Sequence, residues 1–451
     1  MRRRRRKNLP TEPVSLQIEK LSHEGRGIAH NGGKVVFVAG ALPGEQVSAI
    51  LTSRRDSFDE AKLEQVLAAA PERVEPPCSY AGICGGCSLQ HLHPDAQLAF
   101  KEAMLFEQLE HAAGGSTFTR LAALTGPVSG YRRKARLAVR YVHKKGQVLV
   151  GFREKQSSFI TQMDSCEVLD GRLAGLLPLL PGLLGGLQTM REIPQIEVAA
   201  GDPDSDGPTV ALIFRHLQPL PPPDLAALIT FSQEQGFALY LQAGGPDSVC
   251  KVFPSAGEDR LQYRLPAFDL TFGFHPTDFT QVNGIINRAM IEQAVRLLDL
   301  STEDTVLDLF CGLGNFTLPV ARRCHQVIGI EGSDAMVSRA EENARRNGVD
   351  NVAFYRADLT AAMSGASWLA AGYNKVLLDP PRSGAIEILP DIITLAPERI
   401  VYVSCNPATL ARDTAFLTGH GYKLESAGAM DMFPHTAHVE AMALFTRRSK
   451  A

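Results

Sequence analysis

One cysteine is a candidate nucleophile because of its position in the sequence. Cys405 follows the apolar run 400–403 and precedes Asn406-Pro407, so it ends a predicted strand and begins a turn that proline constrains. A lone cysteine is commonly a small core residue. A thiol at the carboxyl end of a strand, however, faces the edge where an open α/β sheet holds its ligands. We therefore predict that Cys405 attacks a substrate.

A turn with two glycines ends another predicted strand and indicates a nucleoside site. Gly312 and Gly314 follow the apolar run 305–310, and glycines allow the backbone to turn sharply and to approach a ligand. Glu331 ends the next run, where a carboxylate can accept from both ribose hydroxyls. Asp358, after a third run, is placed to accept from an adenine amino group. A dinucleotide would need a third glycine at the helix start. This sequence lacks one, so we predict S-adenosylmethionine as the ligand.

A thiol beside a methyl donor suits methylation of a ring carbon that is poor in electrons. Carbon 5 of uracil cannot attack a sulfonium methyl group unaided, but addition of a thiolate at carbon 6 places electron density on carbon 5. A base must then remove the proton from carbon 5 so that the cysteine can leave. Glu440 and His438 are the candidates, and Glu440 opens an apolar strand where a charge is costly unless it is paired or used. The residues alone leave both candidates open.

Two other methylation chemistries compete with this one. Amino-group methyltransferases have a similar fold, but an aromatic residue follows their Asp/Asn-Pro-Pro motif, whereas Arg382 follows Asp379-Pro380-Pro381 here. Methylation of an amine also needs no cysteine. Methylation of carbon 5 of cytosine uses the same thiolate addition, and the pattern of residues does not exclude it.

A group of cysteines near residue 80 predicts a metal centre. Cys78, Cys84 and Cys87 have C-x5-C-x2-C spacing with two glycines between the last two, which allows several thiolates to meet one centre. Cys166 is the best candidate for a fourth ligand. Four thiolates suit either zinc or an iron–sulfur cluster, and the spacing does not decide between them.

The order of predicted strands and helices indicates three domains after a basic tail of residues 1–8. Residues 9–68 contain short strands and glycine turns, with a hairpin signal at Asn31-Gly32-Gly33, and predict a small closed β-barrel. Residues 69–265 predict an α+β domain that carries the cysteines, with a loop at the proline-rich stretch 219–223. In residues 266–451, apolar runs alternate with helical stretches, the pattern of a Rossmann-like α/β domain with a mostly parallel sheet.

The composition fits several packed domains in a cytoplasmic chain. Of its 451 residues 45% are hydrophobic, and the formal net charge is −3, so a nucleic-acid partner must be held by local basic patches. No apolar stretch resembles a membrane span, and no apolar segment follows the basic start as it would in a signal peptide. We expect reduced thiols, no membrane partner and a monomer.

Four segments resemble motifs of the RNA uracil-5 methyltransferases: 307–319, 378–382, 401–413 and 431–436. The match runs through nearly the whole chain. The family includes transfer-RNA enzymes without the metal centre, short ribosomal enzymes without the leading barrel, and a ribosomal branch with both. This chain has the cysteines and a predicted barrel that resembles a TRAM domain, so it is similar to the branch that acts on 23S ribosomal RNA. The resemblance implies a class I, S-adenosylmethionine-dependent methyltransferase fold.

The resemblance also implies roles for individual residues. Cys405 would be the nucleophile and Glu440, rather than His438, the base. The metal centre would be a [4Fe–4S] cluster rather than zinc, held by Cys78, Cys84, Cys87 and Cys166. The residues implied to contact S-adenosylmethionine are Gln281, Phe310, Asn315, Glu331, Asp358 and Asp379. Some relatives have Asn in place of Asp358, and Asn can also accept from adenine.

The implied partner is 23S ribosomal RNA. Basic residues that suit phosphate contacts lie in one predicted strand and the turn after it: Arg132, Arg133, Lys134, Arg136, Arg140, Lys144 and Lys145. The target uracil must be extruded or lie in a loop, and Phe274 or Phe279 is a candidate to stack on it. Two alternatives stay open: methylation of transfer RNA, and a non-catalytic factor that binds ribosomal RNA during assembly. A pure binder would need neither Cys405 nor Glu440.

Overall fold

The chain divides into two compact units. The computed structural model describes residues 12–203, 207–360, 366, 368–369 and 372–448, so the predicted basic tail lies outside the described residues. The first unit contains the residues up to Met104 together with Phe433–His438, and the second contains Leu105–Met432 and the residues from Val439 onward. No helix in the described ranges is long and apolar enough to cross a membrane.

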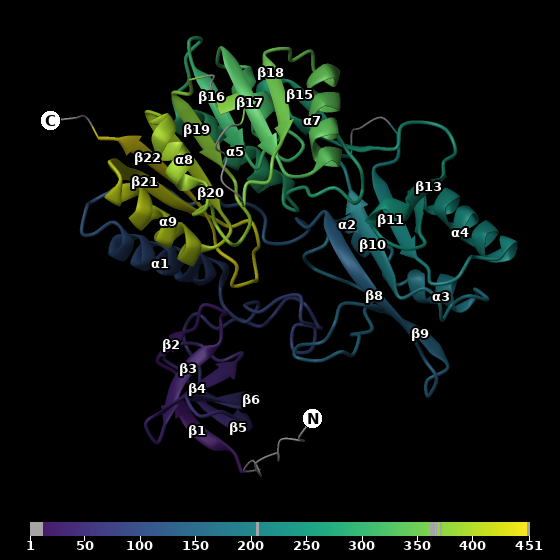
Figure 1. The fold of residues 1–451 in the computed structure, drawn as a ribbon. Coiled ribbons are helices and arrows are strands. Elements are labelled where there is room, and N and C mark those ends of the chain that lie inside the picture. The colour runs from purple at the N-terminus through teal and green to yellow at the C-terminus, as the bar shows by residue number, and fades with distance from the viewer. Residues whose placement is uncertain (1–11, 204–206, 361–365, 367, 370–371, 449–451) are drawn as a thin grey trace, which may run out of the picture. The chain divides into compact units, whose positions relative to one another are not determined.

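The first unit contains a sheet of six short strands that bends around one core (Figure 1). The strands are β1 (Val14–Gln17), β2 (Lys20–Leu21), β3 (Gly27–Asn31), β4 (Lys34–Ala39), β5 (Gln46–Arg54) and β6 (Phe58–Ala68). Their order is β1-β5-β6-β4-β3-β2, and among these pairs only β4 and β6 are parallel. Register shifts between β5 and β6 mark bulges, which increase the bend of a strand. The predicted hairpin is confirmed, because Gly32 and Gly33 join β3 to β4 with positive φ values of 57° and 80°.

A segment from the far end of the sequence completes the first unit. Helix α1 (Pro94–Ala112) begins in this unit, and its Gln97 holds the backbone of His435. The His435 N–H donates to Gln97 Oε1 at 2.8 Å, and the His435 carbonyl accepts from Ser88 and Leu89 N–H, each at 2.9 Å. The stretch 433–438, just before Glu440 in sequence, is therefore fixed by hydrogen bonds.

The central part of the second unit is a mixed sheet covered by short helices. Its strands are β8 (Lys134–Val142), β9 (Gln147–Gly151), β10 (Gln195–Ala200), β11 (Val210–Arg215), β12 (Ala238–Gln242) and β13 (Val249–Phe253), in the order β13-β12-β11-β10-β8-β9. Its helices are α2 (Gly171–Ala174), α3 (Leu180–Gly185), α4 (Pro222–Gln235) and the short 3₁₀ helix η1 (Pro246–Ser248). Helix α4 is the crossover between the parallel strands β11 and β12. The predicted proline-rich loop is thus shorter than expected: α4 already begins at Pro222, since proline is tolerated in the first turn of a helix.

The rest of the second unit is a doubly wound sheet, which we call the catalytic sheet. Its strands are β7 (Thr119–Arg120), β16 (Thr305–Leu309), β17 (Gln326–Glu331), β18 (Val352–Arg356), β19 (Lys375–Leu378), β20 (Arg399–Ser404), β21 (Tyr422–Met430) and β22 (Glu440–Arg447). The order is β18-β17-β16-β19-β20-β22-β21-β7; the five strands from β18 to β20 are parallel, and β22 is antiparallel to both neighbours. The helices are α5 (Gly284–Leu298), α6 (Thr317–Ala321), α7 (Asp334–Arg346), α8 (Leu389–Leu395) and α9 (Pro407–Gly419). A hairpin of β14 (Leu261–Leu265) and β15 (Leu270–Phe274), joined by η2 (Pro266–Phe268), precedes α5.

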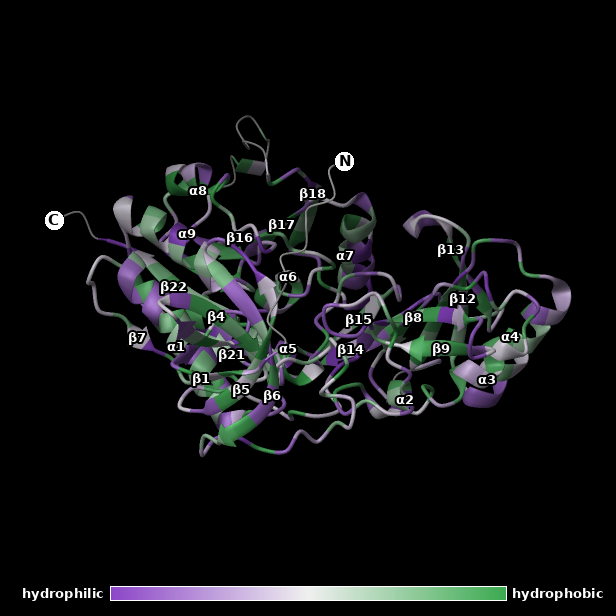
Figure 2. Cartoon of the chain, turned by 90° about the horizontal axis from the view of Figure 1, so that it is seen from below, coloured by the Kyte–Doolittle hydropathy of each residue, from purple (hydrophilic) through white to green (hydrophobic). Residues whose placement is uncertain are grey.

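The central strands of the catalytic sheet are buried on both faces, so they are largely apolar. One core joins Leu309, Leu378 and Tyr402 to α8, α9 and the second half of α1. Successive residues of a strand point to opposite faces, and the intervening Leu377 and Val401 are also fully buried. Figure 2 shows these strands largely in green, the colour of hydrophobic residues. The predicted Rossmann-like α/β fold is confirmed, and its parallel strands end along one edge.

Candidate active site

Four parallel strands deliver the predicted site residues to one edge of the catalytic sheet. Leu309 of β16 pairs with Ile330 of β17 and Leu378 of β19. The residues that follow in each strand are Phe310, Glu331 and Asp379, which therefore lie in one row across the sheet. Ser404 ends β20 and puts Cys405 at the same edge, two residues further along.

The glycine turn is held against the next strand by a predicted ligand residue. Gly312 N–H donates to Glu331 Oε2 at 3.2 Å, and Ser333 N–H donates to Oε1 at 3.0 Å. Phe310, with a φ of 64°, has the left-handed conformation that non-glycine residues adopt at a cost. Gly314 has a φ of 91°, and an added Cβ would lie 3.4 Å from Leu318. This strained turn fixes the backbone beyond β16 while the Glu331 carboxylate stays at the edge.

Three other predicted ligand residues have different surroundings. Asn315 is held in a network: its Oδ1 accepts from the Tyr263 hydroxyl at 2.7 Å, and its Nδ2 donates to Asn287 at 2.9 Å. Asp358 is exposed and accepts from Thr360 N–H and Oγ1 at 2.9 and 2.7 Å, which lowers the pKa of its carboxyl. Gln281 is half-buried in the segment between β15 and α5.

Two carboxyls on neighbouring strands of this edge have raised pKa values. Burial raises the pKa of Asp379 to about 7. Burial also raises the pKa of Asp308, on β16, to about 7, and the nearby charges of Asp379 and Glu331 add to the increase. Thr317 donates to Asp308 Oδ2 at 2.5 Å, whereas Oδ1 is buried without a hydrogen-bond partner in the described part of the chain. Sequence reasoning missed Asp308, although a charged residue inside an apolar run was the signal that singled out Glu440.

The register between β20 and β22 sets Cys405 opposite Glu440. Ser404 pairs with Ala441, so the next pair along these antiparallel strands is Cys405 and Glu440. Glu440 also pairs with Met430 of β21, and its side chain is only 9% exposed. His438 belongs to the first unit, where its side chain is exposed and its ring lies 5.7 Å from that of Phe433. The sheet therefore brings one of the two candidate bases, Glu440, to the thiol.

The surroundings of Cys405 favour the neutral thiol. Burial raises its pKa to about 11, with further increases from the charges of Glu440 and Asp379. Arg382, in the turn after β19, opposes them and lowers the pKa. The thiol thus faces two acidic residues and one guanidinium from two separate segments, the turn after β19 and the start of β22, which is an unusual setting for a core cysteine.

A buried aspartate ties the turn after β19 to strand β20, which precedes the thiol. Asp413 on α9 is fully buried, and its Oδ2 accepts from the Tyr402 hydroxyl at 2.6 Å and from Ala385 N–H at 2.8 Å. Arg412 binds the Asp413 carboxylate and also donates to the Ser383 carbonyl at 2.9 Å. The turn that carries Arg382 is thereby tied to the strand that ends at Cys405. No spacing in the sequence distinguishes Asp413 from other charged residues on an amphipathic helix.

None of the four predicted metal ligands forms a disulfide. Cys78, Cys84 and Cys87 lie in successive turns of the first unit, and Gly86 N–H donates to Cys84 Sγ at 3.4 Å. Cys166 belongs to the second unit and packs against the core of the central sheet. Among the described residues, no group of three or more His, Cys, Asp or Glu side chains forms a metal site.

Several of the predicted RNA contacts are engaged within the protein. Arg133 pairs with Asp202 at 2.5 Å, Arg136 pairs with Glu197 at 2.9 Å, and Lys134 donates to the Asp278 carbonyl at 2.6 Å. Arg140, Lys144 and Lys145, further along, are exposed. Of the two aromatic residues predicted to stack on the target, Phe274 is wrong, since only 3% of it is exposed in the core of β15, whereas Phe279 is 73% exposed.

Comparisons with known proteins agree on one group of enzymes. A family model described as tRNA (Uracil-5-)-methyltransferase matches residues 257–448, and the TRAM domain model matches residues 12–63. The chain is 54% identical over 448 residues to the 23S rRNA (uracil(1939)-C(5))-methyltransferase RlmD of Alkalilimnicola ehrlichii, covering 99% of each chain. It is 52% identical over 447 residues to RlmD of Alcanivorax borkumensis, again covering 99% of each. In fold it resembles a Pyrococcus abyssi tRNA (uracil-54, C5)-methyltransferase solved with S-adenosyl-L-homocysteine, with a TM-score of 0.74 and 24% identity over 96% of this chain and 100% of that one.

Proposed function

Because this chain belongs to the RlmD family of 23S rRNA (uracil(1939)-C(5))-methyltransferases, we propose that it forms 5-methyluridine in 23S ribosomal RNA with S-adenosylmethionine as the methyl donor. The observation that carries the chemistry is the pairing of Ser404 with Ala441, which sets Cys405 opposite Glu440, whose charge acts on the thiol. Although the matched family model is described for transfer RNA, relatives that cover the whole chain at 48–54% identity are named for 23S rRNA. The choice of ribosomal RNA rests on those relatives.

The proposed methyl-donor site is the edge formed by β16, β17 and β19. Glu331 would accept from the ribose hydroxyls, and Asp358 from the adenine amino group. Phe310, Asp379, Gln281 and Asn315 would complete the site, with Asn315 oriented by Tyr263 and Asn287. When bound there, S-adenosylmethionine supplies an electrophilic methyl group. The strained turn at Phe310 supports this proposal because it holds the backbone ready for a ligand.

The proposed reaction uses Cys405 to change the electron distribution of the uracil ring. The thiolate sulfur forms a bond to carbon 6, and the electrons of the carbon 5–carbon 6 double bond move toward the carbonyl oxygen at carbon 4 as an enolate. Carbon 5 then forms its bond to the methyl group as the bond between that methyl and the sulfonium sulfur of the co-substrate breaks, so S-adenosylhomocysteine is the leaving group. Glu440 takes the proton from carbon 5, the double bond re-forms, and the carbon–sulfur bond breaks to release the thiolate.

The charges around Cys405 indicate when its proton leaves. With a pKa of about 11, the thiol is protonated in the free enzyme at neutral pH. Addition to the ring therefore requires transfer of this proton to a neighbouring base or to the substrate. Arg382, the cation that lowers the pKa of the thiol, is placed to stabilise the thiolate as it forms.

We further propose that Cys78, Cys84, Cys87 and Cys166 hold a [4Fe–4S] cluster. Their donor chemistry suits it, since thiolates are the ligands of such clusters, none of the four cysteines is in a disulfide, and backbone N–H groups such as that of Gly86 stabilise cluster sulfur. The cluster would serve structure, because none of the four cysteines lies on the catalytic sheet. Iron and acid-labile sulfide in the anaerobically purified protein, with a brown colour, would support it, whereas stoichiometric zinc in colourless protein would contradict it.

The remaining expectations concern the RNA and the state of the chain. Phe279, which is exposed and lies two residues before Gln281 in the sequence, is the proposed stacking partner of the target base. The TRAM domain is proposed to bind RNA around the target. A monomeric state, a cytoplasmic location and the domain limits at residues 68 and 265 stay predictions.

Two substitutions test the proposed chemistry directly. Cys405→Ala should abolish transfer of a labelled methyl group to a 23S rRNA fragment and should form no covalent adduct. Glu440→Gln should instead accumulate a protein–RNA adduct that survives denaturation, because methylation proceeds and elimination does not. Methylation by Cys405→Ala at the wild-type rate, or a product methylated on nitrogen or on ribose, would refute the mechanism.

A further inference from the structure

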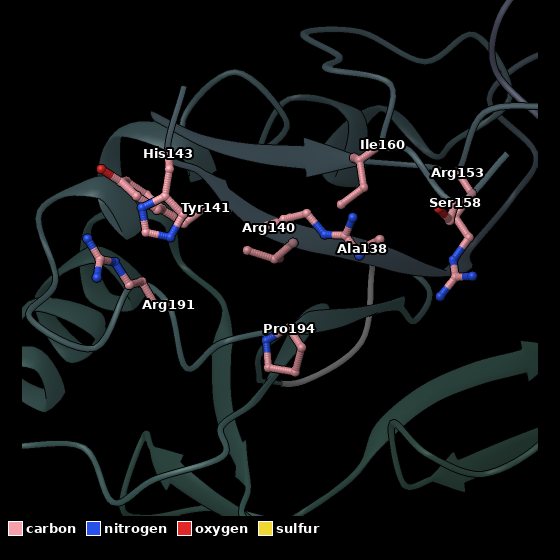
Figure 3. A pocket seen from close by; sticks show the side chains of 10 residues that line it. Ala138, Arg140, Tyr141, His143, Arg153, Ser158, Ile160, Arg191 and Pro194 are labelled. Carbon is pink, nitrogen blue, oxygen red and sulfur yellow. The ribbon is translucent and has the colours of Figure 1, made fainter. Parts of the chain in front are cut away.

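A pocket on the central sheet collects cationic and aromatic side chains away from the catalytic sheet. It has a volume of about 370 Å³ and lies between the second half of β8, the loop after β9 and the turn before β10. We call it the Arg140 pocket; its polar lining is Arg140, Tyr141, His143, Arg153, Ser158 and Arg191. Figure 3 shows Arg191 beside Tyr141 and His143 at one end, Arg153 with Ser158 at the other, and Arg140 between them.

The three arginines of this pocket are not neutralised by the protein. Each is exposed, and no carboxylate forms an ion pair with Arg140, Arg153 or Arg191 within the described residues. The start of the same strand is different, because Arg133 and Arg136 are paired with acidic residues there. The positive charge of β8 is therefore available at its second half, where three guanidinium groups surround one pocket.

Aromatic rings accompany these charges. The Arg191 guanidinium lies 4.8 Å from the centre of the Tyr141 ring, and the Tyr141 and His143 rings meet edge to face at 5.0 Å. Phe159 follows Ser158 in the loop that borders the pocket, and it is 66% exposed without being part of the pocket lining. An aromatic ring beside unpaired arginines, as Tyr141 is beside Arg191, is the combination with which proteins hold unpaired nucleotides, since the bases stack and the phosphates bind the cations.

We infer that the Arg140 pocket binds an unpaired nucleotide of the RNA substrate other than the one that is methylated. A base-paired helix would satisfy the arginines but would offer no base face to Phe159 and Tyr141. An acidic protein segment would likewise leave the exposed ring without a partner. The inference rests on the proposed function for the identity of the RNA, but the pocket belongs to the central sheet and takes no part in the chemistry at Cys405.

The test compares two sets of variants in the full-length protein. The pocket variant carries Arg140→Gln, Arg153→Gln and Arg191→Gln, and the control carries Arg215→Gln, Arg323→Gln and Arg345→Gln, which remove the same charge from exposed positions of the same unit. A separate Phe159→Ala variant removes only an exposed ring. Binding of a fluorescent 23S rRNA fragment is measured by anisotropy at several salt concentrations, and kcat and KM for methylation are measured alongside.

The inference predicts a specific loss of affinity. The pocket variant should bind at least about tenfold more weakly than the control, and the slope of log affinity against log salt should fall by about 2, since each single-strand phosphate contact contributes about 0.7. Phe159→Ala should weaken binding about 5- to 150-fold. In methylation the loss should fall on KM rather than on kcat.

Two results would overturn the inference: wild-type affinity in the pocket and Phe159 variants, or an equal loss in the pocket and control variants. A wild-type protein that binds RNA through the pocket but does not methylate uracil would refute the proposed function alone. Methylation by wild-type protein together with unchanged binding by the pocket variants would refute the pocket alone.

Discussion

Removing the charge of Glu440 should make Cys405 more reactive toward a neutral alkylating agent, even while it stops turnover. The thiolate is the reactive form of a cysteine. With a pKa of about 11, Cys405 has roughly one thiolate in a thousand molecules at pH 8, compared with roughly one in ten for a thiol at the ordinary value of 9.0. Iodoacetamide should therefore modify Cys405 in the wild-type protein about a hundredfold more slowly than an unperturbed thiol.

The relative size of the causes of the raised pKa limits how much faster the alkylation of Cys405 can become. Burial contributes most to the raised pKa, and the charge of Glu440 comes next. Glu440→Gln removes the second cause and leaves the first, so the pKa should fall but stay above 9.0. Alkylation of Cys405 at pH 8 should become faster, by less than about a hundredfold.

The assay follows each cysteine separately by mass spectrometry of peptides after timed exposure to iodoacetamide between pH 7.5 and 10.5. Exposed Cys250 is the internal reference. The matched control is Glu398→Gln, which removes an exposed carboxylate at the other end of β20, about 20 Å from Cys405 at the rise of a strand and beyond the range of unscreened charge interaction. Unchanged or slower alkylation of Cys405 in Glu440→Gln would refute the assignment of Glu440 as the neighbour that holds the thiol protonated.

Two further predictions concern residues that support the fold. Asp413→Ala should lower the free energy of unfolding, measured in urea, by about 2–4 kcal/mol, because it leaves the Ala385 N–H and the Tyr402 hydroxyl buried without an acceptor. Tyr402→Phe removes only one of these hydrogen bonds and should lower it by about 1 kcal/mol. Equal losses in the two variants would contradict this role of Asp413. Glu45 is fully buried, and although burial raises its pKa, hydrogen bonds from Arg73, Leu42 and Ala70 outweigh burial and lower it. Its stabilisation is therefore complete above the unfolded value of about 4.5 and lost as the pH falls through the lower folded value. Hydrogen exchange at the Leu42 and Ala70 amides should accelerate over that range in the wild type, and a similar pH dependence in Glu45→Gln would count against it.

The parallel part of the catalytic sheet could be predicted because the alternation of apolar runs and helical stretches is a local pattern. Three of the apolar runs are followed or ended by a polar or reactive residue: Glu331, Asp379 or Cys405. Since parallel strands that alternate with helices end at one edge, these residues could be brought together before the structure was known.

The proposal of Glu440 rather than His438 as the base could not be reached from the residues alone, because it depends on pairing between strands that are distant in sequence. The two lie two residues apart in one segment, and only the register of Ser404 with Ala441 distinguishes them. Asp413 was missed for a related reason, since its partners Ala385 and Tyr402 come from other segments. The Arg140 pocket could not be predicted for the same reason. The sequence does not show which arginines in and around β8 form ion pairs with acidic residues and which remain unpaired.

The position of β22 has a consequence for how activity arises during folding. This strand follows β21 in the chain, yet it lies between β20 and β21 and pairs with both. The proposed donor edge can therefore assemble from β16 to β20 while Glu440, the proposed proton acceptor, is still absent. A gap must be kept open, or reopened, for the strand that brings it. Insertion with a slip of one residue would turn the carboxylate to the opposite face of the sheet. A newly made molecule should thus gain the capacity to hold its methyl donor before it gains the capacity to release a modified RNA.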